Sequence, residues 1–396
     1  MKSEADASPP RRVAITGVGV VTPLGCHAAG VREAIGRGES AVGRVTRFDP
    51  AGFEQADAAE VAGFDARPFF RVPKALKLCD AKTRFAVAAA ALALRDAGFS
   101  SETGDLDRLG VVIGSSGSDF QAEDLARAVG ESRDDRAASE IPLFAERILS
   151  GLNPLWLLVN LPNMASAHVS IQLGARGPNS TILTDWIAGT QAIGEAALWI
   201  REGEADAVLA GGSDTGVLPF FFGSCSQSGL FGAPEGAERF VPGEGAALFL
   251  LEEYERALAR EARIYGEVCA YAASSSPPDA EENALARSMR WALQEAGWDA
   301  REVTALFCAS APARHLEEER AALAAVFDRD SKQFPPQHFR RALGHALAAS
   351  GPIDLALALP PAAALESHIL ASSLGFSGQA ATLAVRSGPW VGPSSA

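Results

Sequence analysis

One stretch near the middle of the chain, residues 180–200, constrains the fold more than any other. Residues 180–183 form a short β-prone run, and residues 192–200 form an amphipathic run with helical spacing. The residues between them include Trp186-Ile187-Ala188-Gly189, so the pattern predicts a strand, a tight turn and a helix. Such a turn lifts one side chain above the sheet, at the positive end of the following helix. In an enzyme that side chain is a nucleophile. Here it is Trp186, whose indole N–H can only donate a hydrogen bond.

The rest of the chain alternates between β-branched runs and alanine-rich helical runs. This alternation is typical of layered α/β proteins, and the second half repeats the rhythm of the first. Strands are predicted at residues 12–23 (with an exit loop), 109–117, 205–213, 247–252, 265–273, 304–309 and 381–386. Helices are predicted at residues 28–36, 83–98, 283–297 and 317–327. No linker or low-complexity tract separates the halves, so we expect one compact unit.

Composition excludes several classes of protein. The net charge of −14 argues against nucleic acid and anionic membranes as partners. No apolar run approaches the length of a membrane span, and residues 1–11 have the polar character of a disordered lead-in rather than of a signal peptide. The five cysteines show neither pairing nor metal-ligand spacing, which favours reduced thiols in a cytosolic protein. The histidines likewise show no metal-ligand spacing, and neither a metal nor a cofactor is expected.

The central stretch resembles the active-site elbow of the β-ketoacyl synthases, the condensing enzymes of fatty-acid and polyketide assembly. Their motif is Thr-Ala-Cys-Ala-Ser/Thr-Gly, with Ala-Ile-Gly two residues later. Thr184 and Gly189 match this motif, as does Ala-Ile-Gly at residues 192–194, and Trp186 falls on the cysteine. Further stretches similar to the family occur in order from residue 12 to residue 386, among them Gly-Glu-Gly-Ala at residues 243–246, whose Glu244 corresponds to a structural anchor.

The resemblance implies a thiolase-like layered fold, α/β/α/β/α, with two similar halves. We assign residues 12–252 to an N-terminal ketosynthase-like half and residues 253–396 to a C-terminal one. Family members are dimers in which each active site borrows walls from its neighbour. The residues around 163–171 are expected to face the partner.

Two histidines complete the family's catalytic set, and the resemblance indicates what stands at each position. The first belongs in Asn-Ala-His-Gly-Thr after a strand, where this chain has Cys308 or Ala309, depending on the gap. The second corresponds to His345, with Arg340 at a lysine position. A lone histidine beside an apolar helix is more often structural than catalytic, so both roles stay open for His345. His315 lies in a charged stretch and is expected on the surface.

A gate residue and two other thiols complete the candidates. The family motif Gly-Phe-Gly-Gly corresponds to residues 375–378, which makes Phe376 the gate near the cysteine position. We expect Trp186, Phe376 and His345 to line one pocket. Cys225 and Cys308 are the other conceivable nucleophiles, but a small buried thiol is the more economical interpretation of each.

The sequence therefore predicts a non-condensing ketosynthase homologue similar to the chain-length factor of type II polyketide synthases. Those proteins lack the cysteine, usually replaced by glutamine, and pair with an active ketosynthase. The expected partners are a catalytic ketosynthase subunit and, through it, an acyl carrier protein. Two alternatives stay open: a cysteine-independent acyltransferase or malonyl decarboxylase that uses His345, and a homodimeric acyl-binding protein.

Overall fold

The strands of the protein join into one large mixed sheet and one small hairpin. The structure, a computed structural model, describes residues 11–117, 122–131, 141–232, 239–277, 282–309, 312–327, 339–359 and 366–388. The expected lead-in lies outside these ranges apart from Arg11. The large sheet is formed by β1 (Val13–Val21), β4 (Leu109–Gly114), β5 (Asn179–Ile182), β6 (Ala207–Thr215), β7 (Glu244–Glu253), β8 (Gly266–Ser275), β9 (Ala305–Ala309), β10 (Ser367–Leu374) and β11 (Gln379–Ser387). The hairpin pairs β2 (Val42–Arg44) with β3 (Asp57–Ala59).

The order of the strands reveals an internal repeat. Across the sheet it runs β5-β4-β6-β7-β1-β8-β11-β10-β9. Starting from β1, the first half reads β1-β7-β6-β4-β5, with two antiparallel pairings followed by two parallel ones. Starting from β8, the second half reads β8-β11-β10-β9, with two antiparallel pairings followed by a parallel one. The two halves meet where β1 pairs with β8, which bears out the expectation of two similar halves.

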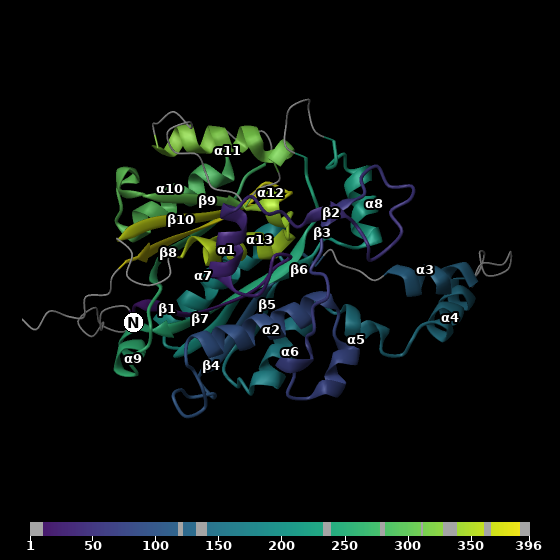
Figure 1. The fold of residues 1–396 in the computed structure, drawn as a ribbon, viewed down its shortest axis with the longest axis horizontal. Coiled ribbons are helices and arrows are strands. Elements are labelled where there is room, and N and C mark those ends of the chain that lie inside the picture. Colours follow the sequence, from purple (N-terminus) through teal and green to yellow (C-terminus); the bar gives the residue numbers. More distant parts are fainter. Residues whose placement is uncertain are drawn as a thin grey trace, which may run out of the picture.

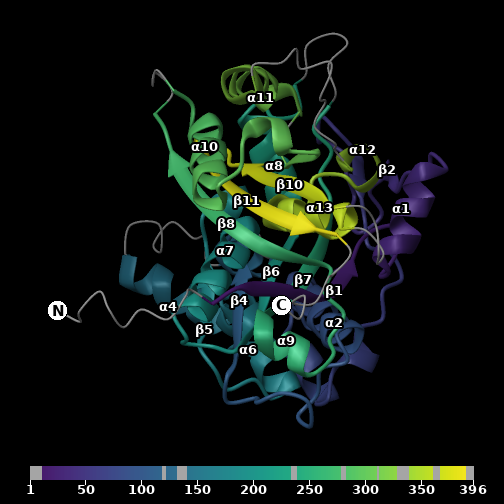
Figure 2. The ribbon, with the colours of Figure 1, turned by 90° about the vertical axis from the view of Figure 1, so that its left-hand side faces the viewer.

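The helices form layers outside and between the two half-sheets. Their bounds are α1 (Ala28–Gly36), α2 (Ala81–Asp96), α3 (Ala122–Glu131), α4 (Ile141–Gly151), α5 (Trp156–Asn160), α6 (Met164–Leu173), α7 (Ala188–Arg201), α8 (Pro219–Gln227), α9 (Tyr254–Ala259), α10 (Ala284–Ala296), α11 (Pro312–Phe327), α12 (Arg340–Leu343) and α13 (Ser350–Ala358). Figure 2 shows α10 and α11 on one outer side and α2 and α6 on the other. Helices α7 and α13 lie between the half-sheets, and their side chains belong to the largest apolar cluster. None of the helices in the described ranges has the length and apolar character that a membrane crossing requires.

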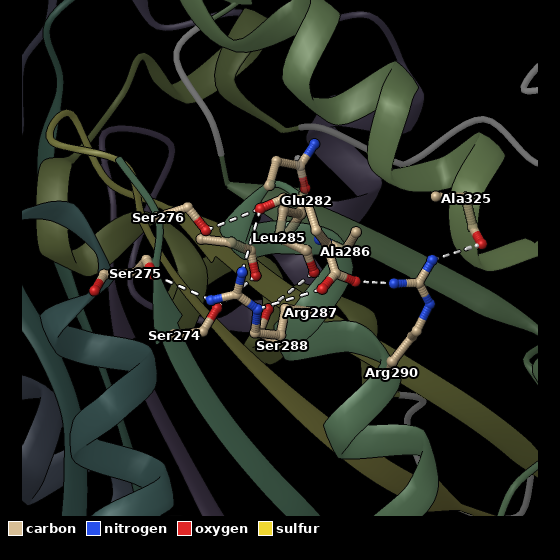
Figure 3. Close-up of polar contacts among 12 residues, drawn as sticks. Ser274, Ser275, Ser276, Glu282, Leu285, Ala286, Arg287, Ser288, Arg290 and Ala325 are labelled. Carbon is tan, nitrogen blue, oxygen red and sulfur yellow. Dashed lines mark hydrogen bonds and ion pairs between the residues drawn. The ribbon is translucent and has the colours of Figure 1, made fainter. Parts of the chain in front are cut away.

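Several predicted helix boundaries are confirmed because they rest on local capping. The Asp80 side chain accepts from Thr83 N at 2.8 Å and starts α2. Asn283 caps α10 in the same way, and Gly297, at φ 69°, ends it in the left-handed conformation. Just before this start the Glu282 carboxylate accepts from Arg287 and Arg290 of the helix, and the Ser276 hydroxyl donates to the Glu282 carbonyl at 3.0 Å (Figure 3). Helix α11 begins at Pro312, five residues before the predicted start, because Pro is well suited to a first helical position.

Candidate functional site

The predicted elbow is present between β5 and α7. A short 3₁₀ turn, η4 (Asp185–Ile187), joins the strand to the helix. Asp185 has φ 57°, a left-handed conformation that aspartate tolerates better than most residues. Gly189 and Gly194 in α7 are required by packing. A Cβ on Gly189 would lie 2.1 Å from the Ala348 carbonyl oxygen, and one on Gly194 would lie 2.2 Å from the Tyr271 ring. The glycines that resemble the family motif therefore let α7 fit between the two half-sheets.

Trp186 lies inside a cluster of aromatic and imidazole rings. Only 4% of its surface is exposed. The centroid of its ring lies 4.7 Å from that of His345, 5.6 Å from Phe376, 5.7 Å from Phe240 and 5.9 Å from His315. The structure thus brings together Trp186, Phe376 and His345, which come from three distant parts of the sequence. At the end of the elbow the indole is therefore surrounded by rings on several sides.

His345 is held by backbone hydrogen bonds and carries a neutral ring. Its N–H donates to the Val241 carbonyl at 2.8 Å, and its carbonyl accepts from Gly243 N at 2.9 Å. Its Nδ1 accepts from Leu347 N at 3.2 Å, so in the neutral ring the proton lies on Nε2. The pKa of His345 lies well below its usual value of 6.5. Burial is the main cause, and the positive charge of Arg340 and the neighbouring His315 lower the pKa further. Nε2 has no hydrogen-bond partner among the described residues.

The expectation for His315 was wrong. The side chain is 1% exposed and packs edge-on against Trp186. The cause is the early start of α11: residues 315, 319, 322 and 323 lie on one face of this helix, and all four are buried. Glu317 and Glu318, two of the charged residues that suggested a surface position for His315, lie on the other face and are exposed. A second imidazole therefore reaches the elbow from a helix and not from a strand end.

Strand β9 ends in the two residues expected at the first histidine position. Cys308 and Ala309 are both buried, and the Cys308 carbonyl accepts from Arg340 Nη1 at 3.0 Å. A hollow of about 10 Å³ lies beside this strand end. Its lining includes Ala309, Arg340, His345 and Asp354. Arg340 is half-buried, so it belongs to this interior and not to an exposed basic patch.

The alternative thiol nucleophiles are buried and protonated. Burial raises the pKa of Cys225 to about 12. Burial, together with the nearby Glu319 carboxylate, raises the pKa of Cys308 well above its usual value. Because the thiolate is the reactive form, neither side chain is set up as a nucleophile. The part of the chain that the structure describes contains no group of three residues able to hold a metal ion.

Glu244 has the anchoring role expected of it. Its carboxylate is fully buried and accepts from Arg47, from Val61 N at 2.8 Å and from the Thr215 hydroxyl at 2.7 Å. These bonds tie the start of β7 to the end of β6 and to the segments that follow β2 and β3. They lie close in sequence to Pro242, which forms a bridge with His345.

Sequence reasoning missed three residues of the site. The Asp185 carboxylate accepts from Phe376 N at 2.5 Å, and Phe240 stacks on Trp186. His315 was dismissed, although extending the buried face of α11 back from Leu323 would have reached it. No local pattern marks Phe240 or the bond from Asp185, because both depend on segments far apart in the chain.

Comparison with known proteins decides the family. Residues 10–257 match the beta-ketoacyl synthase N-terminal domain, and residues 262–377 match the beta-ketoacyl synthase C-terminal domain. The chain belongs to the β-ketoacyl synthase family. The layered fold with a large mixed sheet is therefore the thiolase-like ketosynthase fold.

Individual β-ketoacyl synthase relatives cover nearly the whole chain. The 3-oxoacyl-[acyl-carrier-protein] synthase 2 of Staphylococcus aureus (strain COL) is 28% identical over 362 residues, which are 87% of this chain and 84% of the relative. The solved ishigamide ketosynthase/chain length factor is 26% identical with a TM-score of 0.78, over 97% of this chain and 100% of the other. A type II polyketide ketosynthase solved in complex with its acyl-carrier protein is 24% identical with a TM-score of 0.75, over 96% and 100%, which supports the fold alone.

Proposed function

We propose that this β-ketoacyl synthase homologue is a non-condensing subunit, similar to a chain-length factor, that pairs with an active ketosynthase and helps to shape its acyl or polyketide tunnel. The observation that carries the proposal is Trp186, buried at the elbow where the family motif has its cysteine. An indole can neither form a thioester nor accept a proton from a thiol. Strand β9 ends in Cys308 and Ala309, so it carries no histidine at the position expected for the family's first catalytic histidine.

The likeness to the ishigamide ketosynthase/chain length factor supports this role, since that protein's name includes a chain-length factor. The Staphylococcus aureus relative is named a 3-oxoacyl-[acyl-carrier-protein] synthase, and this name favours the other possibility, an active enzyme. Because a condensing synthase and a non-condensing subunit can share the same fold, the residues at the elbow have to distinguish them.

An exposed apolar surface next to the elbow supports pairing with a second subunit. Strand β5 is the outermost strand of its half of the sheet, so its outer edge can pair with another strand. Leu157, Ile171 and Leu183 lie on α5, on α6 and at the end of β5, and are 59%, 55% and 47% exposed. Such apolar surface is typical of a protein interface. Helices α3 and α4 extend from the body near α5 (Figure 1).

The first test is catalysis by the isolated chain. We expect no β-ketoacyl product when the purified protein is incubated with acyl and malonyl carrier proteins, because no group at the elbow can hold the acyl chain. Mass spectrometry of the carrier proteins reads out the product. Product above a heat-killed control would refute a non-condensing role.

The second test is pairing. Co-expressed with a ketosynthase from its own biosynthetic gene set, the chain should co-purify as a heterodimer. Leu157→Asp combined with Ile171→Asp should abolish pairing, because two carboxylates would be buried in an apolar interface. Trp291→Asp is the matched control, since Trp291 is 49% exposed on α10, far from β5 in the fold. If the chain instead forms a stable homodimer and does not bind the ketosynthase, the alternative of a homodimeric acyl-binding protein would be favoured.

A cysteine-independent acyltransferase or decarboxylase is the second candidate, and one observation favours it. His315 and His345 both face Trp186, so two imidazoles converge on the elbow. Free malonyl carrier protein provides the test: its conversion to acetyl carrier protein by the single chain, lost in His345→Asn and in His315→Asn, would support this activity.

A further inference from the structure

Asp185 forms the bond that joins the elbow to the Phe376 loop. Its carboxylate accepts from Phe376 N at 2.5 Å, across 191 residues of sequence. Asp185 has φ 57°, in the left-handed region, and its carboxylate reaches the loop between β10 and β11. A hydrogen bond to an ionised acceptor is about twice as strong as one between neutral groups.

The loop is shaped to receive the carboxylate. Gly375 N donates to the Gln379 carbonyl at 2.8 Å, which closes the loop as a tight hairpin. A Cβ on Gly375 would lie 3.2 Å from Asp185 Oδ2 and 3.0 Å from Gln379 Oε1, so only glycine leaves the carboxylate its full room. Once the backbone of Phe376 is fixed in this way, its ring lies edge-on against Trp186.

We propose that Asp185 is a latch that positions the gate, occupying with its own carboxylate the backbone N–H that an acyl carbonyl or a small carboxylate would need at the elbow. The inference rests on the proposed non-condensing function and adds to it a second barrier, independent of the missing cysteine. An acceptor tethered to the same chain competes at high effective concentration with any ligand from solution. The elbow therefore stays closed to acyl groups from this side of the molecule.

Hydrogen exchange at Phe376 tests the latch in the isolated chain. Asp185→Gly removes the acceptor, and glycine adopts φ 57° without strain. Its Phe376 amide should exchange faster by roughly ten-fold or more, the size expected for losing a bond to a charged group. Asp185→Asn keeps a neutral carbonyl oxygen as acceptor, so its Phe376 amide should exchange at a rate between those of the wild type and Asp185→Gly. Equal exchange in the wild type and Asp185→Gly would overturn the proposal.

Formate serves as the probe for the vacated donor. Added sodium formate should slow Phe376 exchange in Asp185→Gly but not in the wild type, with sodium chloride at equal ionic strength as control. Failure of formate to protect the amide would show that the N–H does not bind a carboxylate from solution, against the proposal.

Self-acylation provides the functional measurement. Trp186→Cys should react slowly with an acyl thioester, because Asp185 still holds the gate, although the helix N-terminus favours a thiolate. The double variant Trp186→Cys with Asp185→Gly should acylate roughly ten-fold faster or more, by the same loss of one charged hydrogen bond. Equal rates would refute the latch. Since all three measurements use the isolated chain, failure to pair with a ketosynthase would leave them interpretable.

Discussion

Trp186 packs against four rings, two of them imidazoles, and is almost completely removed from solvent. Trp186→Ala should lower the free energy of unfolding by about 3–5 kcal/mol, because a large buried side chain is replaced by a cavity. Trp291→Ala is the matched control and should change stability by less than about 1 kcal/mol, since half of that side chain is in solvent. Chemical denaturation of the two variants measures the difference.

Substitution of Trp186 in the assembled pair distinguishes two roles for this residue, a plug that fills a cavity and a part of the tunnel that sets chain length. We expect Trp186 to act as a plug, with the walls that set chain length at the partner-facing residues 163–171. A well-folded Trp186→Gln subunit should then leave the product length of the pair unchanged while stability falls. A longer or scrambled product, read by mass spectrometry, would instead make Trp186 part of the tunnel.

His345 makes stability depend on pH in a predictable direction. Its pKa in the folded chain lies well below 6.5, the usual value that applies to the unfolded chain. As the pH falls below about 6.5, His345 becomes protonated in the unfolded chain but stays neutral in the folded chain. The free energy of unfolding therefore decreases by up to about 1.4 kcal/mol per pH unit. Above that pH the effect disappears.

His345→Asn isolates this contribution, because its Oδ1 can replace Nδ1 as acceptor for Leu347 N. The difference in unfolding free energy between wild type and variant should change between pH 7.5 and pH 5.5, in favour of the variant at the acidic end. Another buried histidine of lowered pKa, His168, is common to both proteins and cancels. A difference that does not vary with pH would contradict a neutral His345.

At the scale of elements, helix α7 is confined between two half-sheets. Gly194→Ala would bring a Cβ to 2.2 Å from the Tyr271 ring and should cost about 1–3 kcal/mol or more by overpacking. Gly36→Ala in α1 is the control. A Cβ at Gly36 meets nothing within 4 Å, so alanine should be neutral or stabilising by up to about 1 kcal/mol. Thermal unfolding of the two variants measures both changes in stability. Equal changes in the two variants would show that α7 can shift to accommodate the added methyl group.

For the whole molecule, the net charge of −14 predicts weak attraction for an acidic carrier protein, so we expect docking mainly on the partner subunit. One hollow of about 280 Å³ carries more positive than negative charge: Arg67, Lys77 and Arg84 line it together with Asp65, which pairs with Arg67. Lys74 is exposed three residues before Lys77. Cross-linking a carrier protein to the assembled pair should label the partner, and Lys74→Glu with Lys77→Glu should change the yield little. A main cross-link to this chain that those substitutions abolish would make the hollow the docking surface.

The elements could largely be predicted from the sequence because their causes are local. Residues 28–36 and 283–297 were predicted as helices, and the structure has Ala28–Gly36 and Ala284–Ala296 there. Capping side chains, glycine stops and hydrophobic periodicity act within a few residues of one another. Strand β10, which was not predicted, and the early start of α11 show the limit of such signals. The elbow and its protruding tryptophan also follow from the sequence alone.

The surroundings of that tryptophan were decided by the tertiary structure. Phe240 reaches it from a distant segment of the same half, whereas His315 and the bond between Asp185 and Phe376 depend on segments of both halves. Whether a histidine in a charged stretch faces solvent or the core depends on the phase of its helix relative to a distant partner. The sequence determined that a strand, a turn and a helix follow one another here and that Trp186 lies in the turn. The fold determined that this tryptophan is buried, because its ring cluster and the hydrogen bond from Phe376 to Asp185 across 191 residues form only when the chain is assembled.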